Sequence, residues 1–128
     1  MFVVSLLSKS LSLHQLLAWQ EAIKLTGLVY QLSRVFPKEE IYALSSQMRR
    51  AAISVPSNIA EGAGRTGRKE FLRFLSVARG SLCELETQLI LAKNLGYVSD
   101  TSDIDEQIER LFGLLGGLMN SIKERAAT

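Results

Sequence analysis

Apolar residues recur every three or four positions over most of the chain, the spacing of one helical face. The first such segment runs from about His14 to Phe36. Its apolar stripe consists of Leu25, Leu28, Leu32 and Val35, widened by Val29 and Phe36. Because the residue before a proline resists the α conformation, Pro37 predicts that this helix ends at Phe36.

A second helix is expected from Pro37 to Ala63. Proline suits the first helical position, and Glu39 and Glu40 would then lie in the first turn, where the helix dipole favours negative charge. The apolar stripe consists of Ile41, Leu44, Met48, Ala51, Val55 and Ile59. Pro56 lies inside this segment and removes the hydrogen bond to residue 52. Because the stripe continues in phase past it, the sequence predicts a kink at Pro56.

Two further helices are predicted from Arg68 to Leu95 and from Ser102 to Arg125. Their apolar residues alternate in steps of four and three, typical of a bundle seam. They are Phe71, Leu75, Ala78, Leu82, Leu85, Leu89 and Ala92, and then Ile104, Ile108, Leu111, Leu115, Leu118 and Ile122. No segment alternates with the period of a strand, and the connections are short. The sequence therefore predicts an all-α fold, an antiparallel up-down four-helix bundle with a kinked second helix.

The helical pattern begins at His14, which divides the chain into two parts. Residues 14–128 are expected to form one bundle domain, since a chain of 128 residues suits a single core. Residues 1–13 are apolar but too short to span a bilayer, and they lack the basic start and cleavage site of a signal peptide. We expect them to be a loosely ordered N-terminal extension of a cytoplasmic protein that does not enter a membrane.

Charge is concentrated in the middle of the chain. Residues 49–79 hold seven basic and two acidic residues, a formal charge of +5, whereas the rest carries −3 of the total of +2. Within this segment Arg65, Lys69 and Arg73 recur every four residues, with Arg68 beside them. These four residues and Arg49 are the candidate phosphate contacts for a nucleic acid. A solvated surface paired with acidic neighbours is the alternative interpretation.

A polar stripe follows the apolar face of the second predicted helix. It consists of Arg50, Ser54, Asn58 and Glu61, and the third helix offers Ser81 and Glu84 at the edge of its own seam. We expect Arg50 to pair with Glu61 or Glu84, and the hydroxyls and amide to complete a buried network that sets helix register. A binding pocket or subunit interface is the alternative. Acid–base catalysis by Glu61 and Glu84 is the least favoured hypothesis, because no nucleophile, histidine or metal motif accompanies them.

The residues that would mark a catalytic or metal centre do not cluster in this sequence. Cys83 and His14 are the single cysteine and the single histidine, and they lie too far apart in sequence for zinc-site spacing. The glycines from Gly62 to Gly67 match neither a Walker loop nor a dinucleotide fingerprint. We therefore expect no metal, no cofactor and no small-molecule substrate.

Several of these motifs together resemble a known family, the four-helix bundle proteins encoded in 23S rRNA intervening sequences. The motifs are Phe36-Pro37-x-Glu39, the run from Gln47 to Gly62 with Ser54-Val55-Pro56-Ser57-Asn58-Ile59-Ala60-Glu61-Gly62 at its centre, Lys69-Glu70-Phe71, and Gly80-Ser81-Leu82-x-Glu84-Leu85. The resemblance implies a cyclic homopentamer of bacterial origin without enzymatic activity. It also extends to the accessory proteins of diversity-generating retroelements, which bind a reverse transcriptase and nucleic acid. The chain departs from the family pattern at Gly67, where a serine usually caps the third helix.

Two functional hypotheses follow from these observations. The first is a non-enzymatic oligomer that binds RNA or a nucleoprotein through its basic surface. The second is a protein–protein interaction scaffold that binds no nucleic acid. Oligomerisation is expected in both, because apolar residues remain outside the seams. These residues are Phe74, Val77, Leu91, Phe112, Leu114 and Met119.

Overall fold

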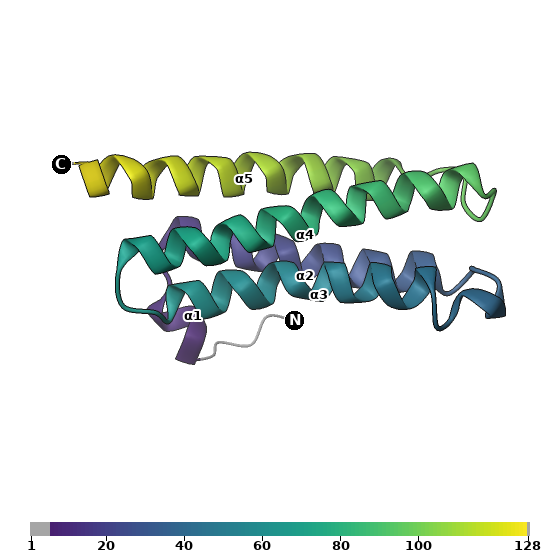
Figure 1. Ribbon diagram of the computed structural model, residues 1–128, viewed down its shortest axis with the longest axis horizontal. Helices are drawn as coiled ribbons and strands as arrows, with labels where there is room; N and C mark the ends of the chain where they lie inside the picture. Colours follow the sequence, from purple (N-terminus) through teal and green to yellow (C-terminus); the bar gives the residue numbers. More distant parts are fainter. Residues whose placement is uncertain (1–5, 128) are drawn as a thin grey trace.

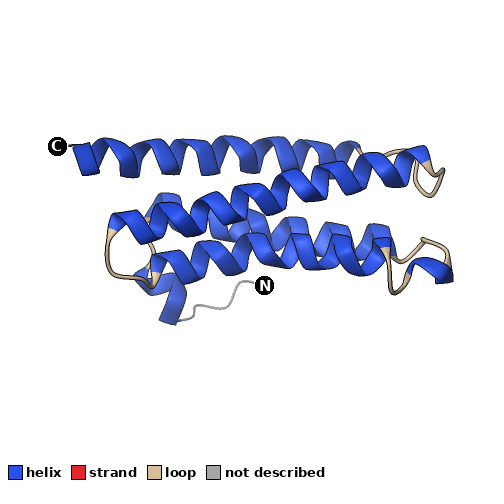
Figure 2. Cartoon of the chain, viewed as in Figure 1, coloured by secondary structure: helices blue, strands red, loops and turns tan. Residues whose placement is uncertain are grey.

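The computed structural model describes residues 6–127, apart from the side chains of Leu6, Ser8 and residues 125–127. Its helices are α1 (Leu6–Ser10), α2 (Leu13–Ser33), the 3₁₀ helix η1 (Lys38–Glu40), α3 (Leu44–Ala63), α4 (Arg68–Asn94) and α5 (Ser102–Ala127). This part of the chain contains no strand (Figure 2). Loops join the four long helices at alternate ends, so successive helices run in opposite directions (Figure 1). The predicted all-α four-helix bundle is confirmed.

The N-terminal extension is partly described. Its first five residues lie outside the described residues, while α1 and the buried side chain of Leu11 belong to the rest of it. Across residues 6–127, no helix combines the length and the apolarity needed to cross a membrane.

The seams of α4 and α5 are buried at every predicted position. Both repeat in steps of four and three without interruption, so each turn of helix supplies a core residue. Buried along α4 are Phe71, Leu75, Ala78, Leu82, Leu85, Leu89 and Ala92. Buried along α5 are Ile104, Ile108, Leu111, Leu115, Leu118 and Ile122. These two helices therefore carry the largest part of the apolar core, as their sequences predict.

The buried line of α2 differs from the predicted one. It consists of Ala18, Ala22, Leu25, Val29 and Ser33. Leu28 and Leu32 are only partly buried at its edge, and Val35 is 69% exposed beyond the end of the helix. The prediction differs because small alanines and a serine face the core on α2. The large apolar residues used for the prediction follow a neighbouring line on the same helix. The start of α2 is set by Ser12 and Gln15, whose side chains accept each other's backbone N–H groups.

The predicted start of the second long helix at Pro37 is wrong. The chain forms only the short η1 there, Ile41 is exposed, and α3 begins at Leu44. Ala43 stands at the N-cap and has no side chain that could cap the helix. The carboxylate of Glu40 replaces it, because its Oε2 accepts the N–H of Leu44 at 3.1 Å. Its Oε1 accepts a hydrogen bond from the hydroxyl of Tyr97 at 3.4 Å, which links the start of α3 to the loop between α4 and α5.

Pro56 lies inside α3, which continues through it from Leu44 to Ala63. A proline has no N–H, so the carbonyl of Ala52 lacks its helical donor. The hydroxyl of Thr26 on α2 lies 3.2 Å from that carbonyl oxygen and 3.0 Å from its own helix's Ala22 carbonyl. A polar contact between helices thus satisfies the group that proline leaves unpaired. The kink itself stays a prediction.

A second polar contact joins α2 to α5. The buried amide of Gln107 donates to the carbonyl and to the Oε2 of Glu21, each at 2.9 Å. Arg110 Nε lies 2.7 Å from the other carboxylate oxygen. The hydrogen bond from Gln107 and the charge of Arg110 lower the pKa of Glu21. This carboxylate is therefore held ionised where the first and last long helices meet.

The helices α3 and α4 pack closely against each other at Gly62. A Cβ added there would lie 2.7 Å from the Cβ of Phe74 and 2.9 Å from Cδ1 of Phe71. Real Cβ atoms do not approach carbon atoms so closely, so only glycine fits without a shift of the helices. Gly62 therefore sets the distance between the two helices just before the loop that joins them.

We predict that Gly62→Ala lowers the free energy of unfolding by about 1–3 kcal/mol, because the methyl group overfills the contact with Phe71 and Phe74. Gly80→Ala is the matched control, since Gly80 lies inside α4 with nothing within 4 Å of the added methyl. That control should raise the free energy by about 0.5–1 kcal/mol through helix propensity. Urea unfolding followed by circular dichroism measures both, and the same sign of change at the two sites would contradict the packing at Gly62.

Candidate nucleic-acid interface

Four of the five candidate phosphate contacts gather at one end of the bundle. Arg65 lies in the loop after α3, and Arg68, Lys69 and Arg73 lie in the first two turns of α4; all four are exposed. The turn depends on Gly67, whose φ of 103° suits glycine. Gly67 also leaves α4 without a side-chain N-cap. We call this region, from Glu61 to Phe74, the α3–α4 tip, and Figure 1 shows it at the same end as the C-terminus of α5.

The ring of Phe74 organises two of these cations. The guanidinium carbons of Arg65 and Arg73 each lie 5.2 Å from the ring centroid, within the range of a cation–π contact. The ring itself is partly buried against the core, because Phe74 packs beside Gly62. Sequence reasoning treated Phe74 only as surplus apolar surface. Its position one residue after Arg73 carries no local signal of this role, because Arg65 approaches it across the loop.

Two carboxylates at the tip pair with the same two arginines. Glu61 Oε1 lies 2.9 Å from Arg65 Nη2, and Glu70 Oε2 lies 3.5 Å from Arg73 Nη2. The side chains in these pairs are 47–67% exposed, so each pair contributes little to stability. With Arg68 and Lys69 included, the tip retains a formal charge of +2. The predicted basic stripe is thus a mixed surface with a positive excess.

The structure does not bring Arg49 to the other candidate contacts. Its Nε donates to the buried hydroxyl of Ser33 at 2.8 Å, and its guanidinium lies over the ring of Tyr30 at 4.9 Å. Arg49 therefore joins α3 to α2. It lies sixteen residues before Arg65, roughly 20 Å away along the bundle.

Part of the expected polar network forms between α3 and α4. The hydroxyls of Ser54 and Ser81 are hydrogen-bonded at 2.7 Å. The amide of Asn58 donates to the carbonyl and the hydroxyl of Ser54 at 2.7 and 2.9 Å. Three short side chains thus satisfy one another in a partly buried position and join the two helices near their middle.

The expected ion pair of Arg50 with Glu61 or Glu84 does not form. Arg50 is exposed and has no ion-pair partner among the described residues, Glu61 binds Arg65, and Glu84 accepts the amide of Gln88 at 3.2 Å. Arg50 and Glu61 share one helix and lie eleven residues apart, roughly 16 Å along it, so they cannot meet within one chain. Charges at the helix edge also remain hydrated, which avoids the cost of burying them.

Glu61 and Glu84 are also too far apart to act as a catalytic pair. Glu61 precedes Gly62, which packs on Phe74, whereas Glu84 lies ten residues further along α4, roughly 15 Å away. Within the described residues, no group of three or more histidine, cysteine or carboxylate side chains could hold a metal ion.

One side of α4 contains an unsatisfied polar group. Val77, Ser81, Glu84, Gln88 and Leu91 follow one another in steps of four and three, and Ser81 faces α3, so all five lie along the α3–α4 side. Val77 and Leu91 are 49% and 47% exposed. Gln88 is only 5% exposed, and its Oε1 has no hydrogen-bond partner among the described residues. A buried acceptor without a donor is costly.

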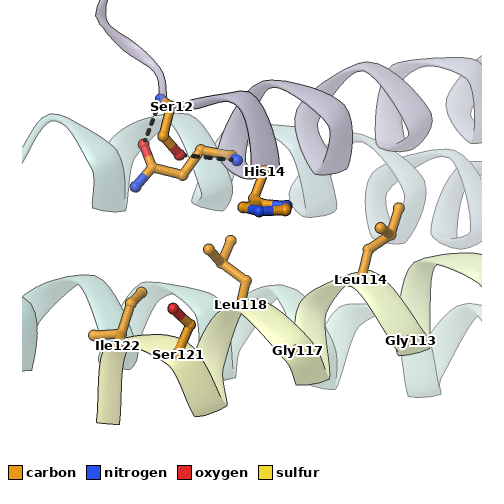
Figure 3. A pocket seen from close by; sticks show the side chains of 9 residues that line it. Ser12, His14, Gly113, Leu114, Gly117, Leu118, Ser121 and Ile122 are labelled. Atoms are coloured by element: carbon orange, nitrogen blue, oxygen red, sulfur yellow. Dashed lines mark hydrogen bonds between the residues drawn. The ribbon is translucent and has the colours of Figure 1, made fainter. Parts of the chain in front are cut away.

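A groove of about 270 Å³ lies between the start of α2 and the second half of α5 (Figure 3). Gly113 and Gly117 leave space on α5, and the His14 ring points from α2 toward Leu118. His14 is the one titratable side chain among the residues lining this groove.

The model of the family described as 23S rRNA-intervening sequence protein matches residues 14–117. The matched segment includes α3, the tip and the polar contacts between α3 and α4. No curated protein matches the chain.

We predict that Ser81→Ala lowers the free energy of unfolding by about 1 kcal/mol, because it leaves the Ser54 hydroxyl without its partner across the helices. Ser76→Ala is the control, since Ser76 is exposed on the same helix. Ser76→Ala and Arg50→Ala should each change the free energy by less than about 0.5 kcal/mol. Chemical unfolding compares the three variants, and a larger loss at Arg50 than at Ser81 would restore the ion-pair interpretation.

Proposed function

The chain belongs to the 23S rRNA-intervening sequence protein family, and we propose on that premise that it is a non-enzymatic oligomer that binds RNA or a nucleoprotein. The α3–α4 tip is the proposed contact surface, and the bacterial cytoplasm is the proposed location. The observation that carries the proposal is the arrangement of Arg65 and Arg73 around Phe74, with Arg68 and Lys69 exposed beside them.

The chemistry of the tip favours phosphate as the group that it binds. Guanidinium groups present several donors in one plane and match the oxygens of phosphate. The ring of Phe74 holds both guanidiniums close to one surface, which reduces the conformational entropy that they lose on binding. Because the guanidiniums already lie over that ring, it is poorly placed to stack on a base. Structured RNA, read through its backbone, therefore fits this surface better than an unpaired strand.

Oligomerisation is the second part of the proposal. Val77 and Leu91 expose apolar surface on the α3–α4 side. A second copy that covers this side would bury both side chains. Met119, in contrast, is buried within one chain, and Phe112 and Leu114 pack against the core. A ring, with five copies as the family resemblance suggests, would also repeat the positive tip and raise the local charge.

A protein–protein scaffold is the alternative function. The observation that favours it is the pairing of Arg65 and Arg73 with Glu61 and Glu70, which reduces the formal charge of the tip to +2. Mixed surfaces of this kind also suit protein partners, because opposite charges on a partner can match both signs.

We predict that the protein has the mass of several copies by light scattering at micromolar concentration. Val77→Glu/Leu91→Glu should reduce the mass to that of one chain, because two charges would be buried at the interface. Ile90→Glu is the control. Ile90 is exposed on α4 and lies about a quarter-turn or more around the helix from Val77 and Leu91, so this variant should leave the mass unchanged. A wild-type mass of one chain would contradict the proposed oligomer.

We predict that a short RNA duplex binds with an affinity that falls as salt rises, because phosphate contacts release counterions. Arg65→Gln/Arg73→Gln should weaken binding and reduce the slope of log affinity against log salt by about 1 for each arginine in each contacting copy. Arg34→Gln/Lys38→Gln removes the same charge at the opposite end of the bundle and serves as the control. Fluorescence anisotropy at several salt concentrations measures all three proteins.

Two outcomes of that experiment would favour the scaffold instead. One is a wild-type protein that binds no duplex at low salt. The other is an equal loss of affinity in both variants, which would show that net charge alone attracts the RNA. Melting curves confirm that each variant is folded, as expected for substitutions at exposed positions.

A further inference from the structure

A closed ring needs two different contact surfaces on each copy. When more than two copies close a ring, one surface of each copy meets another surface on the next copy. The α3–α4 side, on which Val77 and Leu91 are 49% and 47% exposed, is one such surface of the proposed oligomer. The surface that covers it on the next copy must therefore lie elsewhere on the bundle.

The closure of the ring restricts where this second surface lies. In a ring of five, the directions from one copy to its two neighbours differ by about 108°, and in a ring of four by about 90°. The long helices pack in the cyclic order α2, α3, α4, α5, so the bundle has four sides, and adjacent sides face directions roughly 90° apart. Opposite sides would build an open chain of copies. The second surface therefore lies next to the α3–α4 side, on the α2–α3 or the α4–α5 side.

The α2–α3 side exposes more apolar surface than the α4–α5 side. Two stripes of residues, each in steps of four, three and four, run along the contact between α2 and α3, which the hydrogen bond from Thr26 to Ala52 and the contact of Arg49 with Tyr30 locate. Within these stripes, Ile23 and Ile53 are 46% and 42% exposed. The stripes are Trp19, Ile23, Thr26 and Tyr30 on α2, and Arg49, Ile53, Pro56 and Ala60 on α3.

The α4–α5 side offers much less. Ile90 lies three residues before Lys93, which binds Asp105 on α5, so Ile90 belongs to this side. It is the one exposed large apolar side chain there among the described residues. The α2–α3 side is therefore the better candidate for the second surface.

The α2–α3 and α3–α4 sides also match in charge. Arg49 is the one charged residue of the α2–α3 stripes, and Glu84 is the one charged residue among the five that define the α3–α4 side. Neither has an ion-pair partner among the described residues. Arg49 bonds Ser33 through Nε and has both Nη groups left, while Glu84 accepts only the amide of Gln88. The arginine of one copy can therefore pair with the glutamate of the next.

Arg49 and Glu84 also lie at similar levels along the bundle. Because α3 and α4 are antiparallel, the contact of Ser54 with Ser81 gives a common origin for both helices. Glu84 lies three residues from Ser81, about 4.5 Å, and Arg49 lies five residues from Ser54, about 7.5 Å toward the same end. All copies of a cyclic ring stand at one height, so in a ring whose axis follows the helices the two levels differ by about 3 Å.

We propose that the α2–α3 side of one copy covers the α3–α4 side of the next, with Ile23 and Ile53 against its apolar residues and Arg49 paired with Glu84. This inference rests on the proposed oligomer and identifies both of its contact surfaces. The partly buried rings of Trp19 and Tyr30 belong to the same interface, and such side chains often dominate interface energies.

The test mixes two variants that block different surfaces. Val77→Glu/Leu91→Glu blocks the α3–α4 side, and Ile23→Glu/Ile53→Glu blocks the α2–α3 side. Because every contact needs one surface of each kind, each variant alone should have the mass of one chain by sedimentation equilibrium. In an equal mixture, the intact α2–α3 side of the first variant meets the intact α3–α4 side of the second. The mass should then rise to that of two chains and no further.

Leu13→Glu/Ile90→Glu is the matched control. It adds the same charge at two exposed apolar positions outside both sides, so it should keep the wild-type mass. Ile23 and Ile53 are about half exposed, so their replacement should leave the chain folded, which melting curves check. If the glutamates nevertheless unfold the chain, Ile23→Ser/Ile53→Ser takes their place.

Two results would overturn the inference while the wild type remains an oligomer. One is a wild-type mass for Ile23→Glu/Ile53→Glu, which would show that the α2–α3 side makes no contact. The other is a mixture that stays at the mass of one chain up to the highest soluble concentration. A wild type with the mass of one chain has a different meaning, because the proposed oligomer then fails as well.

Discussion

The close packing of α3 against α4 at Gly62 is the constraint on which the candidate site depends. A side chain at this position would collide with Phe71 and Phe74, so the absence of one lets the two helices approach each other just before their loop. Phe71 is then buried in the core, and Phe74 lies at its edge with its ring available to Arg65 and Arg73. The position of both cations thus follows from the distance between two helix backbones.

The forces at the tip differ greatly in strength. Burial of the seam of α4, which includes Phe71, contributes on the order of 10 kcal/mol, since each large apolar side chain contributes about 1.5–3 kcal/mol. The exposed ion pairs of Glu61 and Glu70 contribute about 0–1 kcal/mol each. The core therefore holds the scaffold rigid, while the charged groups on it can exchange partners at little cost. A rigid support with weakly paired cations is suited to a ligand that makes many similar contacts, such as a nucleic-acid backbone.

The sequence predicted correctly those elements that are determined by a regular pattern of residues within one helix. The seams of α4 and α5 were correct because each repeats without interruption, and the Ser54–Asn58–Ser81 contacts join residues expected to lie at facing helix edges. The start of α3 was wrong because its cap, Glu40, belongs to a separate turn and is held by Tyr97, fifty-seven residues away. The Ser12–Gln15 capping box was readable from the sequence but was overlooked.

The arrangement of the candidate site could be predicted only in part, for a related reason. Spacing placed Arg65, Lys69 and Arg73 on one side, but it could not show that Phe74 draws Arg65 and Arg73 together or that Arg49 turns toward Tyr30. Long side chains can pair with groups on neighbouring helices, and several possible partners lie within reach of each arginine. Which pair forms depends on the separation and rotation of the helices, which no local pattern encodes.

The most direct test of the proposed RNA binding at the tip is an NMR titration. It follows the side-chain Nε–Hε resonances of the arginines while a short RNA duplex is added. The account predicts that the resonances of Arg65 and Arg73 shift, because their exposed guanidiniums bind the phosphates of the duplex. It predicts that the resonance of Arg49 stays in place, because that side chain is bound to Ser33 and Tyr30. Shifts confined to Arg49, or no shift at any arginine at low salt, would contradict it.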